Sequence, residues 1–149
     1  MMNTTTIRRA SVDDLPRLLA MAGAFNGEDG HAFGSENRSA LEDLLARPDW
    51  GSVFVVESGH CTIGYAVVCY GYSIEFGGRD AILDEWFIEP AERGAGCGSA
   101  VLAQLEAFCR AEGIVALHLE VMDTNARAQM LYDRMGYPAR KSRLRSKAL

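Results

Sequence analysis

A chain of 149 residues that is 48% hydrophobic and 23% charged has the size and balance of one globular domain with a core of its own. The net charge of −5 argues against a nucleic-acid-binding protein, and no apolar run approaches the roughly 20 residues that span a bilayer. The four cysteines lack C-x-x-C spacing, so neither a zinc site nor a disulfide framework is expected. No segment resembles a signal peptide, which makes the cytoplasm the expected compartment.

The N-terminal region predicts a strand followed by a capped helix. Residues 4–10 alternate as a strand does. Ser11, with Asp14 three residues later, has the pattern of a capping box, and the helix that follows should reach about Phe25. The polar, glycine-containing stretch 26–34 is expected to be a loop.

A second helix and a hairpin come next. Ser35 can cap a helix that stops before Pro48, because the residue preceding proline disfavours helical backbone. The β-rich runs 52–57 and 61–72 flank Ser58-Gly59-His60, so they should pair as a hairpin.

The rest of the chain alternates strands with helices. The expected elements are a strand at 79–88, a helix from the glycine-rich run to Glu112, a strand at 114–121, a helix at 125–135 and a last strand at 141–147. This order predicts an α/β protein whose front half is antiparallel, with a parallel strand–helix–strand unit behind the glycine-rich run.

The most informative motif is Arg93-Gly94-Ala95-Gly96-Cys97-Gly98, between an apolar strand and an amphipathic helix. Alternate glycines let the backbone approach a ligand, and the amides that open a helix attract anions, so this run indicates a phosphate site. A plain tight turn is the other local interpretation.

Two familiar phosphate loops fit this run poorly. The lysine of a Walker loop is missing before Ser99. The spacing is G-x-G-x-G and not the G-x-G-x-x-G of dinucleotide-binding proteins, although Glu120 at the end of the next strand could imitate the acidic residue of that fingerprint. A nicotinamide-dependent oxidoreductase therefore stays open as an alternative.

A second motif lies downstream, Asn125-x-x-Ala-x-x-Leu-Tyr132-x-x-x-Gly-Tyr137. Arg-x-x-Gly-x-Gly followed by this pattern resembles the GNAT superfamily of acyl-CoA-dependent N-acetyltransferases, over residues 53–137 and more loosely over the whole chain. The resemblance implies a single acetyltransferase domain over 1–149, with a three-layer α-β-α fold around a mostly antiparallel mixed sheet that splays at its centre.

The resemblance also implies which residues hold acetyl-CoA, the expected co-substrate, with no metal involved. The main chain around the glycines would bind the diphosphate, and the end of the fourth strand and the first residue of the last helix would bind the pantetheine arm. The residues so implied are Phe87, Ile88, Arg93, Gly94, Ala95, Gly96, Cys97, Gly98, Ser99 and Asn125. Asn125 is locally as well explained as a helix N-cap.

For catalysis, the resemblance places the Tyr132 hydroxyl near the thioester sulfur as a general acid. A carboxylate on the fourth strand would take the proton of the amine. Alternation sends Asp84 and Glu85 to opposite faces of that strand. Polyamine-acetylating relatives favour Asp84, and Glu85 is the reserve candidate. Direct transfer is expected, so Cys97 is not assigned as a nucleophile.

The resemblance implies an acceptor wall made by the first two helices, their loop and the hairpin strands. In this chain those regions supply acidic and aromatic side chains, which suit a small cationic amine. The candidates are Phe25, Glu28, Asp29, Tyr70, Tyr72 and Glu75. We therefore expect acetylation of a polyamine, amino acid or amino-sugar, with no nucleic-acid or membrane partner. A peptide amine, or a regulatory domain that binds acyl-CoA without turnover, are the alternatives. Dimers among relatives favour a homodimer.

Overall fold

A single mixed sheet organises the chain in the computed structural model, which describes residues 4–149. Five strands lie in the order β1-β2-β3-β4-β5, antiparallel except for the β4–β5 pair. The strands are β1 (Thr5–Arg9), β2 (Gly51–Ser58), β3 (Cys61–Ser73), β4 (Gly78–Ile88) and β5 (Ala116–Leu119).

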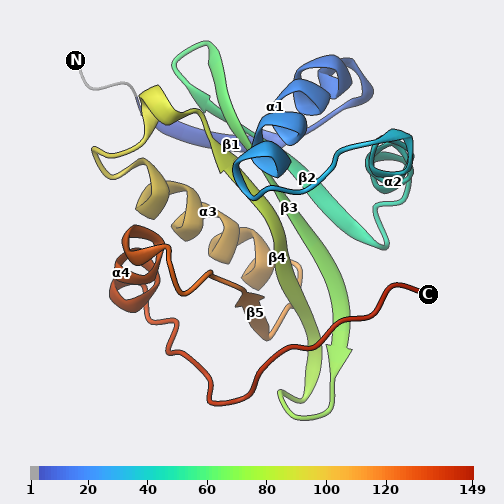
Figure 1. Ribbon diagram of the computed structural model, residues 1–149. Coiled ribbons are helices and arrows are strands. Elements are labelled where there is room, and N and C mark those ends of the chain that lie inside the picture. Colours follow the sequence, from blue (N-terminus) through green and yellow to red (C-terminus); the bar gives the residue numbers. More distant parts are fainter. Residues whose placement is uncertain (1–3) are drawn as a thin grey trace.

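Four α-helices in the described chain cover the two faces of this sheet (Figure 1). They are α1 (Leu15–Glu28), α2 (Ser35–Ala46), α3 (Cys97–Ala111) and α4 (Ala126–Arg134), with 3-10 turns η1 (Val12–Asp14) and η2 (Pro90–Glu92). Helices α1 and α2 lie on one side and α3 and α4 on the other, so the expected three-layer α/β architecture is confirmed.

Strand alternation divides the core into two halves. On β3, Tyr65 and Val67 pack with α1 and α2, whereas Ala66 and Val68 pack with α3. These four positions are at most 3% exposed. Because successive side chains of a strand point to opposite faces, an apolar run such as this one can fill both cores at once.

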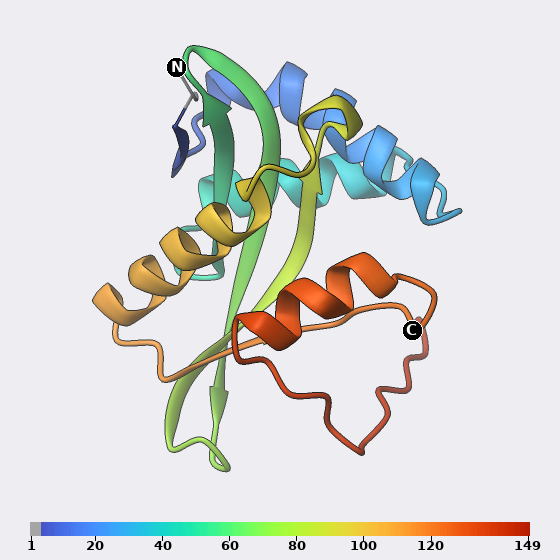
Figure 2. The same cartoon turned by 90° about the vertical axis from the view of Figure 1, so that its left-hand side faces the viewer.

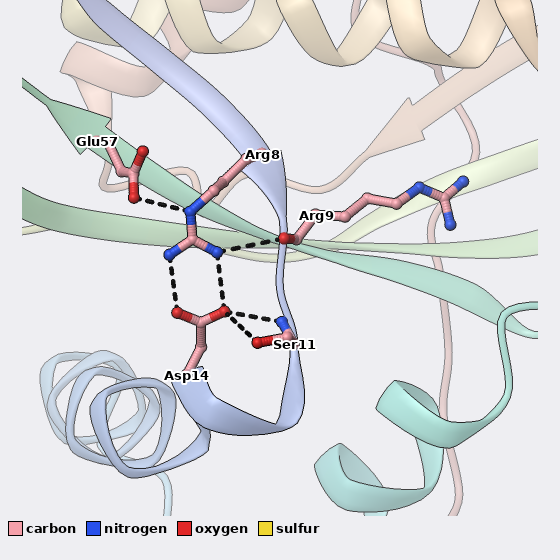
Figure 3. A network of polar contacts seen from close by, with 5 residues as sticks. All are labelled: Arg8, Arg9, Ser11, Asp14 and Glu57. Atoms are coloured by element: carbon pink, nitrogen blue, oxygen red, sulfur yellow. Dashed lines mark hydrogen bonds and ion pairs between the residues drawn. The ribbon is translucent and has the colours of Figure 1, made fainter.

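The start of α1 is fixed to the sheet by a charged network (Figure 3). Arg8 donates to both carboxylate oxygens of Asp14, at 2.9 and 2.8 Å, and to Glu57 at 2.8 Å. Asp14 also accepts from the backbone amide of Ser11 at 2.7 Å, as the capping-box pattern predicts. These hydrogen bonds stabilise the charged form and hold the pKa of Asp14 at about 2.

The two parallel strands separate part of the way along. Strand β5 pairs with β4 only from Asp80 to Leu83, and β4 then continues to Ile88 without β5 beside it. The backbone between residues 84 and 88 is therefore open on that side, which is the splay that the family resemblance implies.

Two expectations about helices and strands were wrong. The first helix does not end near Phe25 but runs to Glu28, so part of the stretch 26–34 is helical and not loop. The predicted strand at 141–147 is absent, since residues 137–149 form no strand. Four of the seven residues at 141–147 are Lys or Arg and its Leu144 is 72% exposed, so no apolar face is available to hold a strand in place.

The β3–β4 hairpin reaches past the helices (Figure 2), and the chain after α4 passes its far end. Arg140 contacts Glu75 there at 2.7 Å. None of the helices described within residues 4–149 has the length and hydropathy needed to cross a bilayer.

Candidate active site

The glycine-rich run forms the loop between η2 and α3 and has an unusual backbone. Three consecutive residues, Gly94, Ala95 and Gly96, have φ values of +103°, +49° and +82°. Ala95 carries a side chain in this left-handed region, at a cost of about 1–2 kcal/mol. Such strain is commonly kept where function requires it.

This backbone leaves hydrogen-bond donors free. Within residues 4–149, no backbone or side-chain acceptor takes the amide hydrogens of Ala95, Gly96 or Ser99. The helix dipole of α3, a 15-residue helix, places partial positive charge at the same point. The loop is therefore suited to an anion such as a phosphate group.

Arg93 precedes this loop and is already engaged. Its Nε donates to the carbonyl of Ile88 at 2.7 Å, and its Nη2 contacts both carboxylate oxygens of Glu28, at 2.8 and 3.0 Å. The guanidinium also lies 5.5 Å from the ring centre of Phe87. Arg93 thus joins the end of α1 to the end of β4.

A cleft of about 420 Å³ opens beside this loop. It is bounded by the end of β4, the start of α3, one face of α4 and the end of α1. Its lining residues are Phe25, Glu28, Asp29, Trp86, Phe87, Ile88, Arg93, Gly94, Gly96, Cys97, Gly98, Ser99, Asn125, Arg127, Ala128, Met130, Leu131, Tyr132 and Arg134. The cleft therefore brings together the two sequence motifs and part of the predicted acceptor wall.

Sequence reasoning missed three prominent residues of this lining, Trp86, Arg127 and Arg134. A Cβ added at Gly94 would lie 3.3 Å from Nη2 of Arg127, so this guanidinium stands against the glycine loop. Trp86 buries its indole N–H, for which residues 4–149 provide no acceptor. No sequence pattern marks these residues, because their position depends on how α4 docks against α3 and β4.

Tyr132 and Asn125 lie on the cleft side of α4. The Asn125 side chain accepts from the amide of Ala128 at 3.1 Å, so it caps the helix. Tyr132 is half-buried, with its ring centre 6.4 Å from that of Trp86. Burial raises the pKa of Tyr132, so its hydroxyl keeps its proton at neutral pH.

Strand β4 contains a bulge at the predicted catalytic carboxylates. Val67 of β3 faces Glu85 and Val68 faces Leu83, so Asp84 is left without a partner. Leu83 packs with α3 but Phe87, four residues later, packs with α1 and α2, which strict alternation forbids.

The expectation that Asp84 and Glu85 face opposite sides is therefore wrong. The extra residue of the bulge places both side chains on the face covered by α1 and α2. Their charges both raise the pKa of Tyr65, on that same face. The sequence carries no signal of this bulge. With two adjacent acidic residues, the alternation of polar and apolar residues is acceptable whether Asp84 or Glu85 is the extra one.

The two carboxylates differ in their surroundings. Glu85 accepts a hydrogen bond from Asn26 of α1 at 3.3 Å and another from the hydroxyl of Tyr65 at 3.2 Å. Asp84 is more exposed than Glu85, although its carboxyl is partly withdrawn from water, and no residue within 4–149 donates a hydrogen bond to it. Desolvation raises the pKa of both carboxyls, so each is a better proton acceptor than an ordinary surface carboxylate.

The predicted acceptor residues fall into two groups. Phe25, Glu28 and Asp29, at the end of α1, line the cleft. The others lie toward the far end of the β3–β4 hairpin: the Tyr70 hydroxyl contacts Ser52 at 2.7 Å, Tyr72 is 75% exposed, and Glu75 contacts Arg140. The structure does not bring this second group into the cleft.

Metal ligands and a cysteine–histidine pair are two other kinds of catalytic group that a cleft can hold. No three His, Cys, Asp or Glu side chains in the described part of the chain gather closely enough to hold a metal ion. Cys97 lines the cleft but is only 7% exposed, and the three histidines line no part of the cleft.

The chain is similar to known proteins at three levels. The model of the acetyltransferase (GNAT) family matches residues 16–137. The thialysine N-epsilon-acetyltransferase of Bos taurus is 33% identical over 78 residues, which cover 52% of this chain and 45% of the relative. The match thus spans less than half the length of this curated relative.

Solved structures extend the similarity to the whole fold. The integron cassette protein HFX_CASS3, from the mobile metagenome of Cole Harbour Salt Marsh, has a TM-score of 0.84 at 30% identity over 96% of this chain and 90% of its own. A predicted acetyltransferase from Clostridium acetobutylicum, solved with acetyl-CoA, has a TM-score of 0.77 at 16% identity over 97% and 96%. At this identity the second match shows the fold alone.

Proposed function

The chain belongs to the GNAT family of acetyltransferases, and from this premise we propose that it transfers an acetyl group from acetyl-CoA to a primary amine of a small cationic metabolite. One observation carries the proposal. The same cleft is lined by the glycine loop with its free amides, the phenol of Tyr132 and the acidic end of α1.

The residues present fit acetyl-CoA. Free amides of Ala95, Gly96 and Ser99 suit the diphosphate, and the unpaired stretch of β4 up to Ile88 leaves main chain for the amides of the pantetheine arm. Arg127 adds a cation beside the loop. The buried indole N–H of Trp86 leaves one more donor in the cleft wall. Acetyl-CoA supplies the activated acetyl group and the leaving thiol.

The side chains then divide the proton transfers. A carboxylate of the β4 bulge, Asp84 or Glu85, accepts the proton that the ammonium form of the amine must lose before attack. Tyr132 holds a proton on its phenolic oxygen and donates it to the departing thiolate. The pKa of Tyr132 is raised by burial from an ordinary value already near 10, so the phenol is protonated at neutral pH, as this role requires.

The class of amine is proposed from the charges around the cleft and from the similarity to a curated relative. Glu28 and Asp29 line the cleft, and Asp84 and Glu85 lie on the same side of the sheet. Arg93 neutralises Glu28, and the other three carboxylates leave this side negative, so it attracts cations. Phe25 adds an aromatic face suited to a cation. The name of the Bos taurus relative adds the side-chain amine of an amino acid to the candidates, beside polyamines and amino-sugars.

A thiol-release assay tests the proposal. Acetyl-CoA is incubated with enzyme and thialysine, lysine, spermidine or glucosamine, and released thiol is followed against an enzyme-only blank, because Cys61 is exposed and reacts with thiol reagents. We expect release with at least one amine and binding of acetyl-CoA in its absence. Binding without release on any small amine, while a lysine-containing peptide is acetylated, would shift the acceptor to peptides. Binding without any release would overturn the catalytic proposal.

A further inference from the structure

The environment of Glu85 distinguishes it from Asp84, although both lie on the same face of β4. Each of its carboxylate oxygens accepts one hydrogen bond. One comes from the side-chain amide of Asn26 and the other from the hydroxyl of Tyr65. A carboxylate offers about four acceptor positions, so two stay available for a further donor. Glu85 is also partly exposed, so a donor can reach it.

Both donors are rigidly held. Asn26 is only 8% exposed, and its amide also donates to the carbonyl of Ala22 at 2.8 Å, one turn earlier in α1. Tyr65 is fully buried, and its ring packs against those of Phe25 and Phe87, with ring centres 6.4 and 6.2 Å away. Phe25 and Phe87 line the cleft, so the network begins one side chain behind its wall.

From this geometry, and resting on the proposed acetyl transfer, we propose that Glu85 accepts the proton of the amine and that Asn26 and Tyr65 are the positioning residues that hold it. The proton moves from the ammonium nitrogen to an oxygen of Glu85, directly or through one water. The nitrogen lone pair then forms the bond to the acetyl carbon, the C–S bond breaks, and the thiolate takes the proton of Tyr132. The second proton that the nitrogen loses as the amide forms restores Tyr132 through water, and Glu85 releases its proton to water. Asp84, exposed and unbonded, attracts the positive charge of the incoming amine.

The arrangement predicts opposite effects of two substitutions on the titration of Glu85. Hydrogen bonds from Tyr65 and Asn26 stabilise the carboxylate, so removing either raises its pKa. The charge of Asp84 opposes ionisation of Glu85, so removing it lowers that pKa. The other groups that face Glu85 are Asp29 of α1 and Cys69 of β3, whose pKa of about 11 keeps it neutral.

The first test needs no substrate. Protein labelled with ¹³C at its Glu carboxyl carbons is titrated by NMR, and the Glu85 signal is the one lost in Glu85→Gln. We expect Tyr65→Phe and Asn26→Ala to raise the midpoint by about 0.5–1 pH unit, the size that one hydrogen bond confers, and Asp84→Asn to lower it. Tyr137→Phe is the matched control: it removes a tyrosine–glutamate hydrogen bond of 2.8 Å, to Glu106, on the other face of the sheet, and should leave Glu85 unchanged.

The second test follows kcat/KM against pH with the amine accepted best. The acidic limb should move up in Tyr65→Phe, move down in Asp84→Asn and disappear in Glu85→Gln. Asp84→Asn should also raise the KM for the amine. A limb that reflects the amine's own pKa would stay in place in every variant and would contradict the proposal.

The outcomes separate the two claims. A Glu85 midpoint that ignores Tyr65→Phe overturns the positioning role, whatever the turnover. Loss of the acidic limb in Asp84→Asn, with Glu85→Gln retaining it, would make Asp84 the base and overturn our assignment. A wild type that turns over no amine, yet shows the expected midpoints, would overturn the acetyl-transfer function and with it the role of Glu85 as a base.

Discussion

The two sides of the cleft are formed by different kinds of chemical groups. The side of α3 and α4 presents main-chain amides of a strained loop and residues of one helix, all from the stretch 93–134. The side of α1 presents side chains from the ends of α1 and β4. Behind them lies the Asn26–Tyr65–Glu85 network, in which Asn26 and Glu85 are 59 positions apart in the chain. A site made of main-chain amides depends on a local sequence motif. A site made of side chains depends on how distant segments pack, and substitutions there can change which ligand it accepts.

The strongest test of this contrast removes one atom from the α4 side. Tyr132→Phe keeps the ring but loses the proton donor, so we expect thiol release to fall about 10²–10⁴-fold, the usual contribution of a general acid. Binding of CoA should be unchanged, because the ring still fills its place beside Trp86. A thiol-release assay measures the rate, and calorimetry measures the binding of CoA. Equal losses in binding and rate would assign Tyr132 to packing instead.

The loop itself can be tested with two glycines of similar backbone. Gly96 and Gly77 have φ values of +82° and +78°, and neither has a neighbour near its missing Cβ. Valine at either position should cost about 1–2 kcal/mol of stability through backbone strain. Only Gly96→Val should weaken CoA binding, by tenfold or more, because Gly77 lies in the β3–β4 hairpin. Equal affinities in a calorimetric titration would disprove main-chain binding.

How far the sequence reaches is clear from these residues. The order of the elements as far as α4, and the glycine loop before α3, follow from local patterns in the sequence. The role of Tyr132 came from the family resemblance and stays a prediction. The sequence did not reveal the bulge at Asp84, since the register of β4 against β3 is set by long-range packing. It also gave no sign that Arg93 pairs with Glu28, because the end of α1 lies 65 residues away in the chain.

The ion pair between Arg8 and Asp14, at the start of α1, can be weakened without changing the glycine loop. The pKa of Asp14 is lowered to about 2 in the folded protein, so its contribution to stability is present above its ordinary pKa near 3.8 and is lost as the pH falls through 2. We expect Asp14→Asn to cost about 1 kcal/mol at pH 7, after allowance for the partial exposure of Arg8, and little at pH 2.

Urea unfolding at both pH values measures this difference. The neighbouring Asp13→Asn, also in η1 but exposed, serves as the control and should change stability little at either pH. An Asp14→Asn cost that is the same at pH 7 and pH 2 would show that the Arg8 pair does not carry the effect.

The smallest expected effect concerns the ion pair between Arg93 and Glu28, which joins the two sides of the cleft. Arg93 must leave Glu28 if it is to reach a phosphate, so Glu28→Gln should free it and tighten CoA binding about two- to fivefold, the range of a partly exposed ion pair. Glu42→Gln breaks a comparable pair, with Arg38 on α2, and should have no effect. Weaker CoA binding in Glu28→Gln would mean that the pair orders the site rather than competing for Arg93.

The central claim, that free main-chain amides of the glycine loop hold the diphosphate, is tested most directly by amide NMR. In ¹H–¹⁵N spectra of labelled protein titrated with CoA, the amides of Ala95, Gly96 and Ser99 should show the largest shifts, and that of Gly77 should stay in place. Saturable binding of CoA with the loop amides unmoved would contradict the account.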